Sequence, residues 1–297
     1  MAVARREKAA GPRERAGLRL PAVDRWALFV LPALVFVLIF FGFPLVDILR
    51  RSFTEPTSGL GNYQTFFESE VYLTVLRRTV VTAAIVTVIC LLLGYPYAYL
   101  MTVVGRRWRI ILLAVVLLPF WTSLMVRTYA WIILLQDTGV INDVLARLGF
   151  GRLSLIRNTT GVAIGMAQIL LPFMVLPLYA TMQGIDRRLL QAAESLGARP
   201  AIAFLRVYVP LSMPGVVAGV TLVFILALGF YITPVLLGSP QNALLSQLIV
   251  QQISQLLDFG LGGAMAAILF VVTLVLLAVL GRVVKPSAAY GGSEEGR

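Results

Sequence analysis

The sequence contains no histidine and a single cysteine, Cys90, among its 297 residues. Without histidine the chain has no imidazole base, no Ser-His-Asp triad and no histidine-ligated metal or haem. With one cysteine it has neither an intrachain disulfide nor a cysteine-cluster metal site. Charge is also scarce, because Asp, Glu, Lys and Arg make up 13% of the chain, about half the share typical of a soluble domain. The low charge excludes an ordinary water-soluble globule.

Long apolar runs take the place of charge, and 59% of the residues are hydrophobic. A helix that crosses a bilayer needs about 20 apolar residues, and the uncharged runs predict six such spans. The predicted spans are 26–47, 79–104, 110–135, 159–183, 212–237 and 260–281. The first span is longer than the apolar core of a signal peptide, and no small-x-small cleavage site follows it, so we expect it to stay as a helix. The predicted fold class is an all-α polytopic membrane protein.

The basic residues predict the orientation of the chain in the membrane. The flanks 1–25, 105–109, 184–211 and 282–297 hold 17 of the 25 Lys and Arg residues, and the opposite flanks hold 8. Cytoplasmic loops are enriched in Lys and Arg, so both termini are expected in the cytoplasm. The basic N-terminal segment is either a solvated tail that orients the first span by attraction to anionic lipid or an arm that docks on a partner. In so apolar a chain the net charge of +11 indicates orientation rather than nucleic-acid binding.

Two segments between the spans have the pattern of short amphipathic helices. In 137–149 the apolar residues share one face, and Gly149 is a suitable C-terminal stop. In 243–257 an apolar stripe lies opposite a polar face. That face carries Ser246, Gln247, Gln251 and Gln255. A helix with such an amide-rich face either lies flat on the outer membrane interface or lines a wet vestibule.

The longest cytoplasmic connection, residues 184–211, predicts two short helices that meet at a corner. Asp186 suits the N-cap of the first helix, and Gly197 suits its end because glycine tolerates positive φ. Pro200 suits the first turn of a second helix that runs to about Tyr208.

Two prolines are expected to separate this second helix from the fifth span. Pro210 and Pro214 each remove a backbone donor, so we predict no continuous helix there, and Ser212 is the candidate cap of the span. In the first helix, four apolar residues recur at helical spacing. They are Leu189, Leu190, Ala193 and Leu196. An exposed apolar surface marks a partner site, so the connection is interpreted as a docking element, the alternative being a plain capped loop.

The same connection resembles the cytoplasmic signature of ABC importer permeases, E-A-A-x3-G-x9-I-x-L-P. The sequence has Gln191-Ala192-Ala193, then Gly197, then Val207-Tyr208-Val209-Pro210, and the spacing matches throughout. Valine replaces both the Ile and the Leu of the signature. Gln191 replaces its first Glu, which removes a charge, although the amide still forms hydrogen bonds and Glu194 lies within a turn.

The resemblance covers about residues 26–282 and is greatest to the spermidine/putrescine permease group. The stretches that carry it are 94–99, 118–131, 171–177 and 227–234. It implies the type I ABC importer permease fold, with six transmembrane helices and a cytoplasmic coupling helix. The expected domains are a basic cytoplasmic tail (1–25), a first transmembrane helix with an external segment (26–71), the ABC transmembrane core (72–282) and a cytoplasmic tail (283–297).

The resemblance also implies a function and a set of partners. The chain would be a permease subunit in the bacterial plasma (inner) membrane that forms the translocation pathway for a small organic solute of the polyamine type. An external binding protein would deliver the solute, a second permease, a paralogue, would complete a heterodimer, and two ABC ATPase subunits would lie beneath. The expected coupling contacts are Leu189, Leu190, Gln191, Ala192, Ala193, Glu194, Leu196, Gly197 and Pro210.

ATP and Mg²⁺ would be used by the partner ATPases. This chain is expected to bind no cofactor and to be no enzyme, because it has no Walker A motif. Five residues are candidates for the translocation pathway. They are Trp121, Arg127, Tyr129, Phe230 and Tyr231. Aromatic faces attract protonated amines, and charges inside a membrane are often functional. The alternatives are rings that face lipid or core, and an Arg127 that snorkels or pairs with Asp47 or Asp137.

Other functions remain open at this stage. The alternative is the same permease role for another small solute, such as an amino-acid derivative or another organic ion. Spans four to six contain no acidic residue except Asp258 at an edge, which disfavours a polycation site inside them. A secondary transporter would need ionisable groups near the midplane, which are almost absent. A membrane-embedded enzyme or a structural assembly protein lacks supporting motifs.

Overall fold

The computed structural model describes residues 25–283, and every regular element in that range is a helix. The chain divides into two compact units, Met1–Asp47 and Ile48–Arg297. In the described part of the first unit lie α1 (Arg25–Val37), the π-helical turn η1 (Leu38–Gly42) and the first residues of α2 (Phe43–Thr54). The predictions for the tails, residues 1–24 and 284–297, lie outside the described residues.

The second unit contains the end of α2 and all later helices. These are α3 (Gly61–Glu68), α4 (Glu70–Val103), α5 (Arg106–Leu117), η2 (Leu118–Trp121), α6 (Leu124–Leu135), α7 (Val140–Arg147), α8 (Thr159–Met182), α9 (Arg188–Ser195), α10 (Pro200–Ala203), η3 (Phe204–Tyr208), α11 (Val209–Leu228), α12 (Ile232–Leu237), η4 (Pro240–Asn242), α13 (Leu245–Ser254) and α14 (Phe259–Val283).

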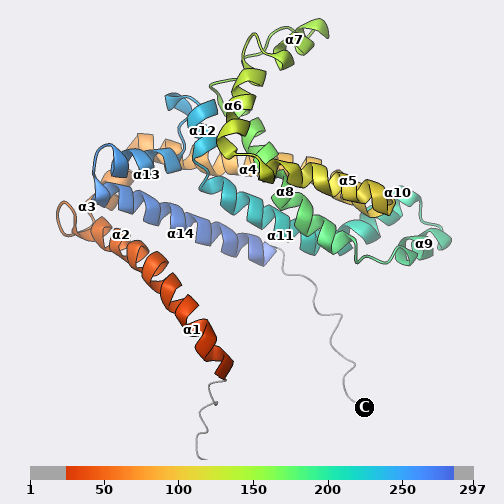
Figure 1. Cartoon of the computed structure of the whole chain (residues 1–297), viewed down its shortest axis with the longest axis horizontal. Helices are drawn as coiled ribbons and strands as arrows, with labels where there is room; N and C mark the ends of the chain where they lie inside the picture. Colours follow the sequence, from red (N-terminus) through yellow and green to blue (C-terminus); the bar gives the residue numbers. More distant parts are fainter. Residues whose placement is uncertain (1–24, 284–297) are drawn as a thin grey trace, which may run out of the picture. The chain divides into compact units, whose positions relative to one another are not determined.

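Helices α4, α8 and α11 pack side by side and hold the main core of the second unit (Figure 1). Glycines bring the three backbones close together. Gly94 of α4 and Gly219 of α11 both face Met174 of α8, where an added Cβ would lie 3.0 Å and 2.7 Å from its side-chain atoms. Such small-residue contacts are the usual packing device of helices in a bilayer, where no hydrophobic force drives helices together.

A second core cluster lies at the end of the unit that is farthest from α9 and α10 (Figure 1). It joins α3, α4, α13 and α14 through six buried side chains. They are Phe66, Val75, Leu245, Leu261, Met265 and Ile268. The predicted amphipathic helix in 243–257 is therefore confirmed as α13, and part of its apolar stripe is buried in this cluster.

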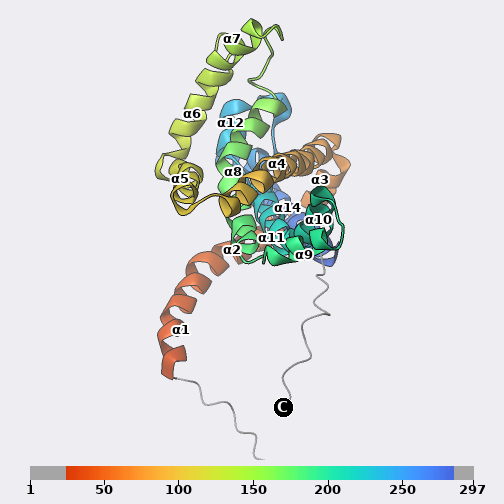
Figure 2. The same ribbon diagram turned by 90° about the vertical axis from the view of Figure 1, so that its right-hand side faces the viewer.

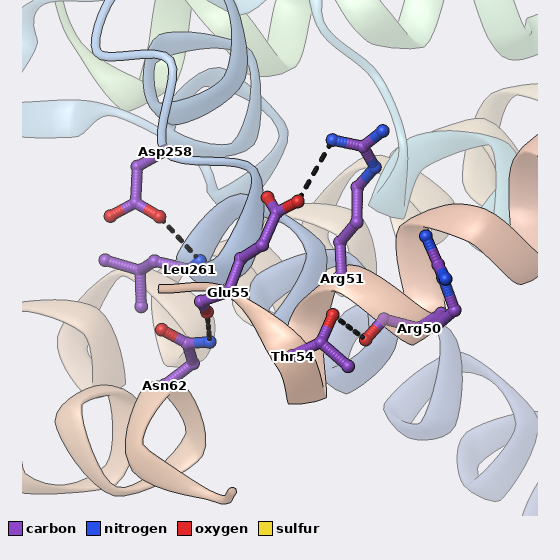
Figure 3. A network of polar contacts seen from close by, with 7 residues as sticks. All are labelled: Arg50, Arg51, Thr54, Glu55, Asn62, Asp258 and Leu261. Atoms are coloured by element: carbon purple, nitrogen blue, oxygen red, sulfur yellow. Dashed lines mark hydrogen bonds and ion pairs between the residues drawn. The ribbon is translucent and has the colours of Figure 1, made fainter. Parts of the chain in front are cut away.

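Polar contacts join the end of α2 to α3, and another lies at the start of α14 (Figure 3). Asn62 Nδ2 donates to the carbonyl oxygens of Ser52 at 2.9 Å and Glu55 at 2.7 Å. Asp258 Oδ1 accepts from the backbone N–H of Leu261 at 2.9 Å, which caps the start of α14. Asn62 thus fastens α3 to the end of α2 inside the second unit.

Within residues 25–283, five helical segments are long and apolar enough to cross a membrane. They are Leu31–Thr54, Glu70–Val103, Thr159–Met182, Pro200–Leu228 and Phe259–Val279. The predicted third span, 110–135, is wrong as a single helix, because Arg106–Trp121 and Leu124–Arg147 meet at 101°. The break follows Pro119, where the helix tightens into the 3-10 turn η2 and Thr122 is extended. Counted as one bent span, this pair brings the total to six.

Helix α4 begins at Glu70, nine residues before the predicted start at 79. The prediction placed the start of this span after Arg77 and Arg78 because it allowed no charged residue inside a span. A long arginine side chain is nevertheless tolerated near the end of a span, since it reaches polar partners. Arg78 Nη1 donates to the carbonyl oxygen of Ala243 at 3.4 Å. Most of residues 48–78, which separate the first two predicted spans, is helical.

The predicted interruption before the fifth span is wrong. Helix runs without a break from Pro200 to Leu228, because the π-turn η3 precedes Pro210. In that wide turn the N–H of Val209 bonds the carbonyl of Phe204, five residues earlier, instead of the carbonyl four residues earlier. The helical hydrogen-bond pattern is therefore already shifted at Pro210, which has no N–H to donate. Ser212 is therefore no cap: its hydroxyl donates to the carbonyl of Val209 at 2.8 Å.

The fifth span also ends earlier than the predicted residue 237. Helix α11 stops at Leu228, and α12 is a separate short helix after Gly229 and Phe230. The predicted amphipathic helix in 137–149 is confirmed as α7. Gly149 ends it at φ +86°, with Phe150 N–H bonding Leu145 and Gly149 N–H bonding Ala146, the double contact of a Schellman motif.

Candidate functional site

The elbow, residues 186–203, combines α9, a tight corner and α10 beyond the ends of α8 and α11 (Figures 1 and 2). The sequence predicts Asp186 as the N-cap, but the N-cap of α9 is Arg187, and Asp186 lies one residue earlier. Its Oδ1 accepts from the N–H of Arg188 at 2.9 Å, so it still satisfies a backbone donor at the start of the helix. Gly197 has φ +90°, its N–H bonds Glu194 at 2.9 Å, and Ala198 N–H bonds Ala193 at 3.1 Å. The predicted glycine corner is confirmed as a Schellman motif.

Helix α9 has no buried residue, although half of it is apolar. Leu190 is half-buried and packs against the main core, and Ala193 is half-buried on the same side. Leu189 is 48% exposed and Leu196 is 90% exposed. Gln191, Ala192, Glu194 and Gly197 are exposed as well. The elbow therefore rests on the bundle by one face and presents an apolar face that no described residue covers.

Pro210 is the one predicted coupling residue that the structure separates from the others. It lies exposed in the first turn of α11, beyond the π-turn, while the other eight lie in α9 and its corner. The signature therefore spans two structural elements, because it begins in α9 and ends in the first turn of α11.

Four aromatic rings hold η3, the turn that follows the elbow, against α4, and sequence reasoning missed them. The four-ring cluster consists of Tyr95 and Tyr99 on α4 with Phe204 and Tyr208 on η3. The ring centroids of Tyr99 lie 5.3 Å from Phe204 and 5.2 Å from Tyr208, both edge-on. The signal was present, because each pair is spaced i, i+4, but aromatic pairs are common in apolar helices and do not reveal their partner.

Three of the predicted pathway residues lie on η2 and α6. Trp121 is 89% exposed and Tyr129 is also exposed. The Nε atom of Arg127 is buried and has no hydrogen-bond partner among the described residues. No ion pair between Arg127 and Asp137 is present in residues 25–283, so that structural alternative is not supported.

The other two pathway residues lie between α11 and α12. Phe230 packs in part against the main core, and its carbonyl accepts from the hydroxyl of Ser246 at 2.7 Å. Tyr231 lines a cavity of about 400 Å³. The two groups of pathway residues lie on neighbouring elements, because Thr128 of α6 and Thr233 of α12 have hydroxyls 3.4 Å apart. Within the described residues no ring contact joins them.

The outer cavity, as we call the space beside Tyr231, has three glutamines on its wall. Gln247, Gln251 and Gln255 of α13 and the residue after it line it together with Ser239. The Oε1 atom of Gln247 accepts from the N–H of Leu244 at 2.6 Å, which fixes that side chain. Of the two predicted roles for the amide face, lining a wet vestibule fits this arrangement. No Asp or Glu lines the cavity.

Comparison with known proteins assigns the family. No family model matches the chain. The spermidine/putrescine transport system permease protein PotB of Escherichia coli K12 is 35% identical over 233 residues, which cover 78% of this chain and 84% of PotB. This chain belongs to the ABC transporter permeases. A second relative, the inner membrane ABC transporter permease protein YdcU of the same organism, is 32% identical over 74% of the permease and 77% of YdcU.

Solved structures agree with the fold. A permease chain of a bacterial ABC transporter that imports the acidic polysaccharide alginate has a TM-score of 0.72, with 20% identity, 88% of this permease covered and 96% of that chain. The same transporter in complex with its alginate pentasaccharide-bound periplasmic protein gives a TM-score of 0.69 at 21% identity, over 89% of this permease and 96% of that chain. The permease therefore has the fold of an ABC importer membrane subunit.

Proposed function

We propose that the permease couples ATP hydrolysis by a cytoplasmic ATPase to the import of a polyamine-like solute. It belongs to a family of membrane subunits of ABC transporters, and the elbow is the observation that carries the coupling role. A short capped helix with uncovered leucines, held rigidly beyond the bundle, suits a groove on a partner. Chemical energy from the partner would reach the membrane helices through this contact.

The partners follow from the same reasoning. Two ATPase subunits bind ATP and Mg²⁺, and this permease binds no cofactor of its own. A second permease, a paralogue, completes the pathway, and an external protein delivers the solute. A periplasmic protein bound to the alginate transporter of the same fold supports the last partner. The elbow, the N-terminus and the C-terminus lie on the cytoplasmic side of the inner membrane, as the excess of Lys and Arg there predicts.

The coupling role is tested by co-purification and reconstitution. The permease, its second permease and its ATPase are expressed together, and ATPase bound to the permease is measured for wild type and for Leu196→Gln. Full burial of a leucine is worth about 1.5–3 kcal/mol, so the variant should bind the ATPase about 10- to 100-fold more weakly. Leu153→Gln is the matched control, because Leu153 is also exposed but lies in the connection between α7 and α8. Equal binding by wild type and Leu196→Gln would contradict the proposal.

The solute is inferred from chemistry and from the relatives. PotB is named for spermidine and putrescine. The outer cavity offers what a protonated amine needs in transit, namely amide oxygens and the ring face of Tyr231. Because no carboxylate lines it, an amine would be held weakly, and weak binding favours release toward the pathway. Selection among solutes would then rest with the external protein.

A ligand screen tests the solute class. The external binding protein that co-purifies with the complex is titrated with spermidine, putrescine, amino acids and sugars. Binding of the polyamines in preference to the others is expected. Preference for an amino acid or a sugar would refute the polyamine assignment and leave the permease role intact.

The amide wall of the outer cavity gives a separate prediction. Gln251→Leu should lower the rate of polyamine uptake several-fold, because one acceptor for the ammonium groups is lost, while ATPase binding stays unchanged. Uptake of labelled putrescine into proteoliposomes measures the effect. Leu256→Gln is a suitable control, since Leu256 is exposed on the same segment but does not line the cavity. If uptake by Gln251→Leu equals that of wild type, the cavity takes no part in the pathway.

A further inference from the structure

The weakest point of the helical path from the elbow to the fifth span is the π-turn η3. It lies at Phe204–Tyr208, between α10 and α11, with no other break from Pro200 to Leu228. Helices kink preferentially at π-bulges, because the regular hydrogen-bond ladder is interrupted there. A displacement of α9 could therefore be lost by bending at η3 before it reached α11.

The four-ring cluster lies across this turn. Phe204 and Tyr208 are the first and last residues of η3, and their rings stack at 5.2 Å with 14° between the planes. Tyr99 of α4 contacts both rings edge-on, and Tyr95 contacts Phe204 at 6.5 Å. Edge-to-face and offset-stacked rings are the favoured geometries of aromatic pairs. The two ends of the turn are thus held to each other and to one neighbouring helix.

Polar contacts at either side of the turn reach the same helix. The hydroxyls of Tyr95 on α4 and Ser212 on α11 lie 2.9 Å apart. On the other side of the elbow, Arg187 Nη2 donates to the carbonyl oxygen of Thr102 near the end of α4. Tyr208 is 2% exposed, so its ring is fully packed. The elbow is therefore fastened to α4 both before α9 and after α10.

We propose that the four-ring cluster is a brace which stiffens the π-turn and makes α4 move together with α11 when the elbow is displaced. Tyr99, Phe204 and Tyr208 are positioning residues in this account, since they act through helices and touch no solute. The proposal rests on the proposed coupling function. It adds that the displacement is delivered to two core helices at once rather than to α11 alone.

The test removes one ring from α4 and leaves η3 unchanged. Tyr99→Leu is compared with Tyr99→Phe, which keeps the ring, and with Tyr97→Leu. Tyr97 is a matched control, because it lies on the same helix but donates to the carbonyl of Leu112 on α5 at 2.8 Å. Complexes with the second permease and the ATPase are reconstituted, and solute imported per ATP hydrolysed is measured. This ratio does not depend on how much complex folds.

Tyr99→Leu is expected to lower the imported solute per ATP several-fold, while Tyr99→Phe and Tyr97→Leu keep the wild-type ratio. A wild-type ratio in Tyr99→Leu would overturn the proposal, and so would an equal loss in Tyr97→Leu. If the wild-type complex itself imports nothing on addition of ATP, the proposed function fails instead, and the brace is then judged by a second measurement.

That second measurement needs no transport. Spin labels are attached at Arg199→Cys, an elbow position outside the predicted coupling residues, and at Val81→Cys on α4. Both positions are exposed, and the buried Cys90 takes up no label. In the assembled complex the distance between the labels should be narrowly distributed, with or without ATP. Tyr99→Leu should broaden the distribution and Tyr99→Phe should not. Equal widths in all three proteins would show that the rings do not stiffen the elbow.

Discussion

Gly197 places the corner of the elbow by its backbone conformation alone. Its φ of +90° lies where residues with a side chain are rarely found, and a Cβ added there would meet no atom within 4 Å. A larger side chain at this position would therefore cause backbone strain without any steric clash with a neighbour. The effect of a substitution should follow the tolerance of each residue for positive φ rather than its size.

Gly197→Val should leave the permease in the membrane but uncouple uptake from ATP hydrolysis. A β-branched residue in this conformation costs about 1–2 kcal/mol, which favours a different exit from α9. Solute uptake and ATPase activity of the reconstituted complex measure the loss. Gly197→Asn is the control, because asparagine visits the left-handed region more readily, and it should keep most of the coupling. Normal uptake by the valine variant would count against the role of the corner.

At the scale of elements, the start of α14 is set by close backbone approach to α2. A Cβ on Gly260 would overlap the carbonyl oxygen of Glu55, and one on Gly263 would lie 2.8 Å from the carbonyl oxygen of Ile48. Both neighbouring atoms belong to the backbone, which cannot rotate away as a side chain can. The polar contacts of Asn62 and the salt bridge between Arg51 and Glu55 at 3.2 Å surround the same approach (Figure 3).

Gly260→Ala should therefore destabilise the permease, although the change adds only one methyl group. Overpacking of this kind costs about 1–3 kcal/mol, and a lower Tm of the detergent-solubilised protein is the expected result. Gly281→Ala makes the same change in the same helix at a site with no atom within 4 Å of the added Cβ. It should leave the Tm unchanged or raise it slightly, since alanine favours helix. Equal Tm values for the two variants would contradict the packing account.

The elements that sequence analysis predicted correctly are those with local causes. Asp186, Gly149 and Gly197 act on their own turn of backbone, so their caps are visible in the sequence. The errors arise where partners distant in sequence decide. Arg78 lies inside α4, where its side chain bonds the distant carbonyl of Ala243, and Pro210 stays in helix because η3 has already shifted the ladder. The two turns that bound α9 could therefore be predicted from the sequence, whereas the four-ring cluster and the outer cavity required the tertiary structure.

At the scale of the whole molecule, the proposed function requires that its two working regions lie on opposite sides of a membrane. The elbow lies at one end of the second unit, and the outer cavity is built from α12, α13 and the connection between them, which lie at the other (Figure 1). The long helices α4, α8, α11 and α14 connect the two ends. A movement of the elbow could thus alter access to the cavity only through these helices.

Cysteine labelling measures this orientation directly. Leu196→Cys on the elbow should react with a membrane-impermeant maleimide only in inverted vesicles, and Phe150→Cys, next to α7, only from the outside of intact cells. Both native side chains are exposed, and the buried Cys90 gives little background. Labelling of Leu196→Cys from outside the cell would reverse the predicted orientation and remove the basis of the coupling proposal.

The uncovered leucines of the elbow have a consequence for how the cell must make this protein. A copy that reaches the membrane before its ATPase is available exposes these leucines to the cytosol. Chaperones, proteases and the exposed leucines of other copies then compete to bind them. Balanced synthesis of the subunits would limit the time that the apolar face of each elbow stays exposed. Permease made in excess over the ATPase should therefore have a shorter half-life in the cell.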